Sequence, residues 1–426
     1  MIDFLNKIID FQYRFKIKIK LFIPMLILIG VSLVLLNYSN TEKSFLFYSQ
    51  IRWAIFGSLL IIIFSYIKID FIYKHSYKLY ILLFTLLLLT LIFGNIVNNS
   101  QRWLSIGFSF QPSEIGKLLF IFFIAKLLVN RPKRYSDFKV MCLILVQTLL
   151  IVFLILKQPD LGTALVYLFA IFPMMIWSGV KFINIVILTS PIISFLISFI
   201  YEFTEGNLVD LNETYFFILF AIWILFITFT VFKKYKFTIL SGSIILANLS
   251  ITTLTKIFIK KIEGHYWLKR ITAYLDPLKY KNDLAYQINS SYDAIGSGGF
   301  LGKGLGNGML TEFKMMPIYE SDFIVSALAE QFGLISIFML LVLLGYFFYW
   351  LVTYLDKCIN KFEQLILVGF CSVWFFHFFV NLCIVSGIFP VTGLPFPFLS
   401  YGGTHFLTNC IMLAIANRII SEHISN

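Results

Sequence analysis

YQINSSYDAIGSGGFLGKGLGNGMLTEFKMMPIYESDFIVSALAE, residues 286–330, is the longest polar and glycine-rich interruption in an otherwise apolar chain. Long apolar segments precede and follow it, and Asp322 stands where it runs into the next one. A carboxylate at such a junction lies at low dielectric but within reach of water, which suits a general base. The sequence therefore indicates a reaction centre at Asp322, with a helix cap as the alternative role.

Composition places the chain in a membrane. Of the 426 residues, 59% are hydrophobic and 13% are charged, whereas soluble domains carry about 25% charged residues. Since a span needs roughly 20 apolar residues, the sequence predicts an all-α, polytopic membrane bundle of about 12 helices. The segments lie near 20–37, 50–67, 77–94, 112–129, 140–157, 161–178, 181–201, 214–232, 237–256, 323–353, 364–386 and 403–420.

The short loops predict the orientation. Lys and Arg gather before the first segment and after the second, fourth and eighth, and basic loops face the cytoplasm. Both termini are therefore expected to be cytoplasmic, and the first 20 residues lack the apolar core of a cleavable signal. Residues 1–426 are predicted to form one domain, with the long loop 257–322 on the outer face.

Several functions have no support. The net charge of +12 is explained by positive loops and anionic membrane lipids rather than by nucleic acid. The five scattered cysteines lack the spacing of a metal site. No nucleotide-binding glycine motif is present.

Charged residues mark the outer ends of several segments. Glu114 and Lys117 share one helical face at the start of the fourth; a helix start with an acidic first turn explains Glu114 but not Lys117. Arg102 precedes this segment beside Trp103 and is either an outer cation or an interfacial anchor. Asp160, in KQPDLGT, either caps the sixth segment or faces Lys117 or Arg102.

The long loop and the C-terminal region add further candidates. Arg270 lies in HYWLKRITAYLDP, a mixture of aromatic and basic residues expected at a headgroup layer. Lys303 lies in the glycine run, which is interpreted equally well as a phosphate-binding backbone or as a mobile loop. Glu330 follows Asp322 by about two helical turns, on roughly the same face. Ser400 belongs to GLPFPFLSYGGT, whose irregular backbone must be buried or line a cavity.

Five stretches of the sequence that contain most of these residues resemble, in the same order, the signatures of the SEDS family (shape, elongation, division and sporulation), whose members include RodA and FtsW. They are NSQRWLSIGFSFQPSEIGK, KQPDLGT, YQINSSYDAIGSGGFLGKGLGNG, PIYESDFIVSALAEQFG and VNLCIVSGIFPVTGLPFPFLSYGGT. The resemblance implies an inverting peptidoglycan glycosyltransferase that polymerises lipid II outside the bacterial cytoplasmic membrane with a class B penicillin-binding protein. It implies that Asp322 matches the essential aspartate, Glu114 and Lys117 the buried pair, Asp160 the turn aspartate and Arg102 the arginine before a tryptophan.

The chain also departs from the family pattern. Ile318, Glu320 and Ser321 replace the usual Glu, His and Thr before the aspartate, and the segments within 214–256 raise the usual ten spans to twelve. The stretch 307–317 resembles the elongation type, RodA, in length. Asp322 is expected to deprotonate the acceptor, while Arg102, Lys117, Lys303 or Arg270, with a divalent cation such as Mg or Mn, offset the pyrophosphate charge. A lipid II flippase and a non-catalytic scaffold for the penicillin-binding protein are the alternatives.

Overall fold

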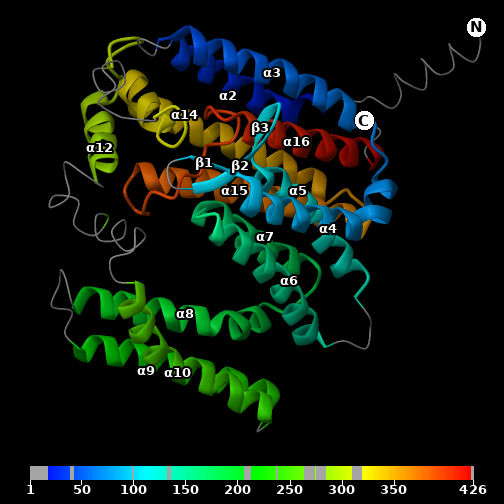
Figure 1. The fold of residues 1–426 in the computed structure, drawn as a ribbon, viewed down its shortest axis with the longest axis vertical. Helices are drawn as coiled ribbons and strands as arrows, with labels where there is room; N and C mark the ends of the chain where they lie inside the picture. Colours follow the sequence, from blue (N-terminus) through cyan, green and yellow to red (C-terminus); the bar gives the residue numbers. More distant parts are fainter. Residues whose placement is uncertain are drawn as a thin grey trace, which may run out of the picture. The chain divides into compact units, whose positions relative to one another are not determined.

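The computed structural model describes residues 18–38, 43–97, 100–131, 136–205, 213–236, 238–262, 274, 285–308 and 319–423. In these ranges each of the twelve expected segments corresponds to one long helix, so the all-α bundle is confirmed. The helices are α2 (Ile19–Asn37), α3 (Lys43–Ser65), α4 (Ile69–Phe93), α5 (Pro112–Val129), α6 (Asp137–Lys157), α7 (Leu161–Trp177), α8 (Phe182–Glu205), α9 (Glu213–Tyr235), α10 (Ile239–Ile262), α14 (Ile324–Leu355), α15 (Lys361–Val385) and α16 (Gly403–His423) (Figure 1).

Nine of these helices are long and apolar enough to cross a membrane by length and composition. The other three are α5, α7 and α16. Helix α7 has 17 residues, and α5 carries three charged side chains, Glu114, Lys117 and Lys126. The charged residues of α5 are all buried, which indicates that this helix lies inside the protein rather than against lipid.

The loop between α4 and α5 forms a small antiparallel sheet, which the sequence did not predict. Its strands are β1 (Asn95–Val97), β2 (Ser100–Ile106) and β3 (Phe108–Phe110), in the order β1-β2-β3. Gly107, with a φ of 76°, forms the tight turn between β2 and β3, a conformation that costs glycine little. The strand β2 carries Arg102 towards the start of α7, as described below.

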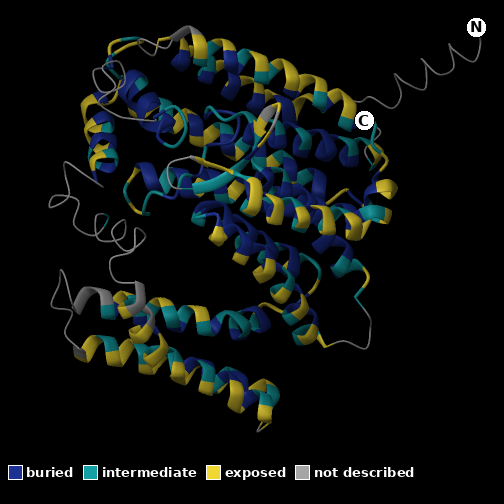
Figure 2. Ribbon diagram, viewed as in Figure 1, coloured by how far each residue is buried: buried dark blue, intermediate teal, exposed yellow. Residues whose placement is uncertain are grey.

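The chain divides into two compact units. Unit 1 comprises Met1–Pro132, Ile144–Ser178 and Gln287–Asn426. Within it α16 packs against α3, α4 against α5, and α15 against α7, α5 and α14. Helix α15 is its central element, because 72% of the residues in its apolar 18-residue stretch are buried, against 22% for α3 and α4. Figure 2 shows α5, α15 and α16 coloured mainly as buried.

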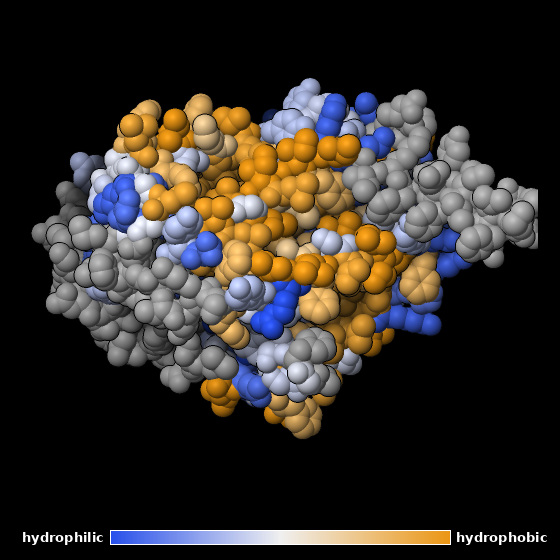
Figure 3. Space-filling model, turned by 90° about the horizontal axis from the view of Figure 1, so that it is seen from above, coloured by the Kyte–Doolittle hydropathy of each residue, from blue (hydrophilic) through white to orange (hydrophobic). Residues whose placement is uncertain are grey.

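The outer helices of unit 1 present apolar side chains to the surroundings. On α3 these include Phe45, Ile55, Phe56, Leu59 and Ile63, all more than half exposed or close to it. Figure 3 shows a broad apolar surface on the face seen from above, the side on which α2 and α3 lie in Figure 1. Such a surface is expected where helices face lipid.

Unit 2 comprises Lys133–Leu143 and Gly179–Tyr286. Its helices α8, α9 and α10 pack on one another around Ile187, Ile227, Val231 and Ile244. Asn248 on α10 donates to Ser190 Oγ at 2.9 Å and accepts from Ser194 Oγ at 2.6 Å, a polar clamp of the kind that joins helices in membranes. The two additional spans, α9 and α10, therefore find their packing partner in α8.

Candidate functional site

Asp322 lies in a turn at residues 319–323, directly before α14, and its side chain is partly exposed. The turn is held from α15 and from the loop that precedes α16. Asn381 Nδ2 donates to Asp322 O at 2.9 Å, Tyr401 N donates to Glu320 O at 2.8 Å, and Ser400 Oγ donates to Ser321 O. Ser400, a predicted site residue, is therefore brought to the turn that carries Asp322.

The Asp322 carboxylate faces a glycine. A Cβ atom built on Gly393 would lie 3.6 Å from Asp322 Oδ2, and Gly393 has a φ of 74°, which a non-glycine residue rarely adopts. A side chain at position 393 would therefore contact the carboxylate. Ile318, which departs from the family pattern, lies outside the described residues, as does Arg270.

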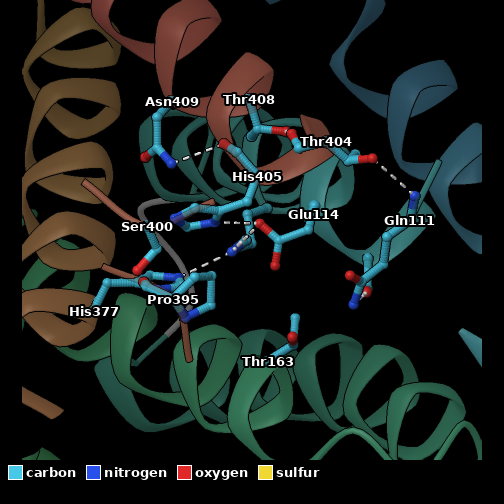
Figure 4. A network of polar contacts seen from close by, with 12 residues as sticks. Gln111, Glu114, Thr163, His377, Pro395, Ser400, Thr404, His405, Thr408 and Asn409 are labelled. Carbon is cyan, nitrogen blue, oxygen red and sulfur yellow. Dashed lines mark hydrogen bonds and ion pairs between the residues drawn. The ribbon is translucent and has the colours of Figure 1, made fainter. Parts of the chain in front are cut away.

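A second cluster lies buried between α5, α15 and α16 (Figure 4). Lys117 Nζ lies 2.8 Å from Glu114 Oε2 and 2.9 Å from His377 Nε2, and His405 Nδ1 lies 2.7 Å from the same Glu114 oxygen. All four side chains are at most 6% exposed. The expected pairing of Glu114 with Lys117 is confirmed, and two histidines extend it.

The hydrogen bonds assign the protons of His377. Its Nδ1 lies 3.1 Å from Pro395 O, and a carbonyl oxygen only accepts, so Nδ1 carries the proton. Its Nε2 then accepts from the Lys117 ammonium, which makes His377 neutral. Glu114 in turn accepts from Lys117 and from His405 Nδ1, so one carboxylate is stabilised by two donors.

Leu394 and Pro395 connect the cluster to the Asp322 turn. Asn381 Nδ2, which donates to Asp322 O, also donates to Leu394 O at 2.9 Å. His377, one helical turn earlier on α15, donates to the adjacent Pro395 O. One loop thus links the turn of Asp322 with the buried charges.

Asp160 both caps α7 and faces Arg102, which are the two roles that the sequence left open. Its partner is not Lys117. It caps α7, accepting from Thr163 N at 3.2 Å, and it accepts from Gln111 Nε2 at 2.8 Å. Arg102 NH1 lies 3.8 Å from Asp160 Oδ1, and Arg102 Nε donates to Gln158 O at 3.3 Å. Arg102 therefore holds the turn at residues 158–160, and its guanidinium group is engaged mainly by other groups of the protein.

The start of α7 also packs directly on the loop that holds Asp322. A Cβ atom on Gly162 would lie 2.7 Å from Thr392 O, so only glycine permits this approach. Asp160, two residues earlier, is thereby kept close to the 392–395 segment. The structure thus brings together the regions of Arg102, Glu114, Lys117, Asp160, Asp322 and Ser400.

Lys303 and Glu330 form a separate pair. Lys303 Nζ lies 3.0 Å from Glu330 Oε1, and the Glu330 side chain is fully buried. The backbone amides of Lys303 and Gly304 donate to Glu330 O and Gln331 O, each at 3.0 Å. These amides are used within the protein, which disfavours a phosphate cradle at these two positions.

The sequence reasoning missed His377, His405 and Asn381. An ionisable side chain inside an apolar segment is costly unless it has a partner, and the run VWFFHFFVN around His377 carries that signal. The same rule had identified Glu114 and Lys117. Among the described residues no group of three or more His, Cys, Asp or Glu side chains is arranged to hold a metal ion.

The fold and the site define an integral membrane protein of many helices, in which buried charges and a partly exposed aspartate are joined by one irregular loop. The chain belongs to the FtsW/RodA/SpoVE family, described as "Cell cycle protein", whose sequence profile matches residues 12–210 and 207–424. The resemblance to the SEDS family is thereby confirmed.

Named relatives cover nearly the whole chain. The RodA peptidoglycan glycosyltransferase of Treponema pallidum is 29% identical, over 94% of this chain and 95% of the relative. The probable peptidoglycan glycosyltransferase FtsW of Saccharophagus degradans is 27% identical, over 96% and 93%. Relatives of both names are similar to this chain, so elongation and division roles are not distinguished.

Solved structures share the fold. A peptidoglycan synthase complex, described as coordinating polymerization and crosslinking, contains a chain with a TM-score of 0.69 and 23% identity, covering 96% of this chain and 99% of that chain. The crystal structure of the rod shape determining protein RodA of Thermus thermophilus gives a TM-score of 0.60 at 22% identity, covering 96% and 97%.

Proposed function

We propose that this chain is a peptidoglycan glycosyltransferase that polymerises lipid II into glycan strands at the outer face of the bacterial cytoplasmic membrane. Family membership over almost the full length supports the activity. The single observation that carries the assignment of the site is the turn at Asp322, which bonds from Asn381, Ser400 and Tyr401 hold next to Gly393.

In the proposed reaction Asp322 acts as the general base. Its carboxylate accepts the proton of a sugar hydroxyl, the hydroxyl oxygen bonds to the anomeric carbon of a second lipid-linked sugar, and the bond from that carbon to the lipid pyrophosphate breaks. Attack opposite the leaving group inverts an α linkage to β. A positioned general base contributes about 10²- to 10⁴-fold to the rate.

The sequence suggested several cations that could offset the pyrophosphate charge, but three of them are paired with other groups of the protein. Arg102 is engaged by the 158–160 turn, Lys117 by Glu114 and Lys303 by Glu330. We also propose that a divalent cation such as Mg or Mn would offset the charge of the pyrophosphate. These three cations act by holding the protein around the site.

The membrane arrangement and the partner follow from the same proposal. Basic loops on one side of the spans support cytoplasmic termini and an active site on the outer face. The likeness to a chain from a peptidoglycan synthase complex supports assembly with a class B penicillin-binding protein that crosslinks the strands. The elongation role, RodA-like, rests on the length of 307–317.

One purified preparation tests the assignment. Asp322→Asn is compared with Asp293→Asn, which changes an exposed carboxylate on α12 (Tyr286–Gly298). Lipid II polymerisation, with the penicillin-binding protein present, should fall by at least about 10²-fold for Asp322→Asn and stay unchanged for Asp293→Asn. Wild-type rates in Asp322→Asn would disprove the base. Lipid translocation into liposomes without glycan formation by the wild type would instead support the flippase.

A further inference from the structure

The starting observation is a break within α14. Gly333 has a φ of 71° and a ψ of −174°, so the helix consists of a first part, which begins at Ile324, and a second part, which follows Gly333. Backbone groups freed inside a span must find partners in the protein. We call residues 330–335 the helix break.

The glycine-rich segment that the sequence singled out supplies these partners. Lys303 N and Gly304 N donate to Glu330 O and Gln331 O, each at 3.0 Å. In the opposite direction, Leu334 N donates to Gly299 O at 3.0 Å and Ile335 N to Phe300 O at 3.3 Å. Residues 298–304, the glycine loop, therefore cap both parts of α14.

Only glycines permit this fit. A Cβ atom would lie 2.3 Å from Gln331 O at Gly302 and 2.2 Å from Phe300 O at Gly333, and both residues have positive φ. A Cβ at Gly298 would lie 2.2 Å from Ala329 O. The glycine spacing is thus explained by close backbone contact with α14.

An ion pair fastens the glycine loop to the break. Glu330 Oε1 lies 3.0 Å from Lys303 Nζ, with Glu330 fully buried and Lys303 24% exposed. Removing one partner of a pair that includes a buried charge is strongly unfavourable. If the glycine loop moved away from the helix break, this ion pair and the backbone hydrogen bonds would both be lost.

The first part of α14 connects the break to Asp322. It begins at Ile324, directly after Asp322 and Phe323, and Ser326 N donates to Phe323 O at 2.9 Å. Ser326 Oγ also lies 2.7 Å from Ser291 Oγ on α12, the helix that leads into the glycine loop. A shift of the glycine loop would thus displace this part of α14 and the turn at its start.

We propose that Lys303 and Glu330 are positioning residues of the transferase reaction, which hold the glycine loop in the break of α14 and thereby fix Asp322; this rests on the proposed function. In this proposal both residues act through the position of Asp322. Breaking the pair should therefore lower kcat and leave the KM for lipid II unchanged, because displacing a base by about 1 Å lowers the rate by about 10²-fold.

The test combines hydrogen exchange with kinetics on the full-length protein. In Glu330→Gln and Lys303→Met, the amides of 303–304 and 334–335 should exchange faster, and kcat should fall by about 10-fold or more at unchanged KM. Lys303→Arg, which keeps the charge, should retain both properties. Gly302→Ala should behave like Glu330→Gln, whereas Gly296→Ala, which meets nothing within 4 Å, is the matched control.

The outcomes separate the two claims. Faster exchange with wild-type kcat, or unchanged exchange in both Glu330→Gln and Gly302→Ala, would overturn the positioning role. An equal loss of kcat in Lys303→Arg and Lys303→Met would also overturn it, since the charge of the side chain would then be irrelevant. A wild-type protein that forms no glycan would refute the proposed function instead, whatever the exchange shows.

Discussion

Breaking the buried pair of Glu114 and Lys117 should destabilise the protein more than removing both charges. In Lys117→Met the Glu114 carboxylate, 3% exposed, keeps the His405 Nδ1 donor at 2.7 Å but loses the ammonium at 2.8 Å. His377 Nε2 loses its donor as well. Removing one partner of a buried pair costs about 3–5 kcal/mol.

The double variant Glu114→Gln/Lys117→Met leaves no unpaired charge in the cluster. It should be no less stable than the worse single variant, which gives a coupling energy of about 3 kcal/mol in the double-mutant cycle. The free energy of unfolding in mixed detergent micelles is the measurement. Arg418 and Glu422, an i,i+4 pair near the C-terminal end of α16, form the control cycle, with a coupling of about 0.5 kcal/mol. Additive losses at Glu114 and Lys117, or a single loss below about 1 kcal/mol, would refute this account of the cluster.

Three further predictions use the same preparations. Gly162→Ala should cost about 1–3 kcal/mol of unfolding free energy, because its Cβ would lie 2.7 Å from Thr392 O, whereas Gly30→Ala in open space on α2 should be neutral or stabilising. Asn381→Leu removes the donor to Asp322 O and Leu394 O and should cost about 1–3 kcal/mol of unfolding free energy with a lower kcat; unchanged turnover would contradict the role of Asn381 in holding the Asp322 turn. Burial, with a smaller contribution from the Glu363 carboxylate, raises the pKa of the Cys358 thiol to about 12. Because the thiolate is the reactive form, maleimide labelling of Cys358 should be slow across roughly pH 7 to 9 and should still rise about tenfold per pH unit at pH 9, where an ordinary thiol levels off, until the protein unfolds.

Local sequence properties were enough to predict the helices. An apolar run of sufficient length is a span wherever it packs, so twelve segments correspond to twelve helices in the described residues. The pairing of Glu114 with Lys117 was also predictable, since residues three apart on a helix are neighbours. The cap of α7 at Asp160 follows from the same short-range geometry.

Partners from distant parts of the chain were not predictable in the same way. His377 reaches Lys117 across 260 residues and His405 reaches Glu114 across 291, contacts that depend on how α15 and α16 pack on α5. Glu330 was expected on roughly the face of Asp322, but the break at Gly333 brings it a partner in the glycine loop. The β2–β3 hairpin likewise depends on a positive φ at Gly107 that the sequence allowed without requiring.

The loop at residues 392–401 explains why the buried charges and the partly exposed aspartate belong to one site. It accepts a hydrogen bond from His377 at Pro395, packs on Gly162 at Thr392, and holds the Asp322 turn through Ser400 and Tyr401. Irregular backbone at membrane depth requires such bonds from the surrounding protein. Lys117 and Glu114 fix the position of His377, and His377 fixes the loop. We therefore infer that the buried cluster supports catalysis from a distance, by holding the loop against which Asp322 is placed.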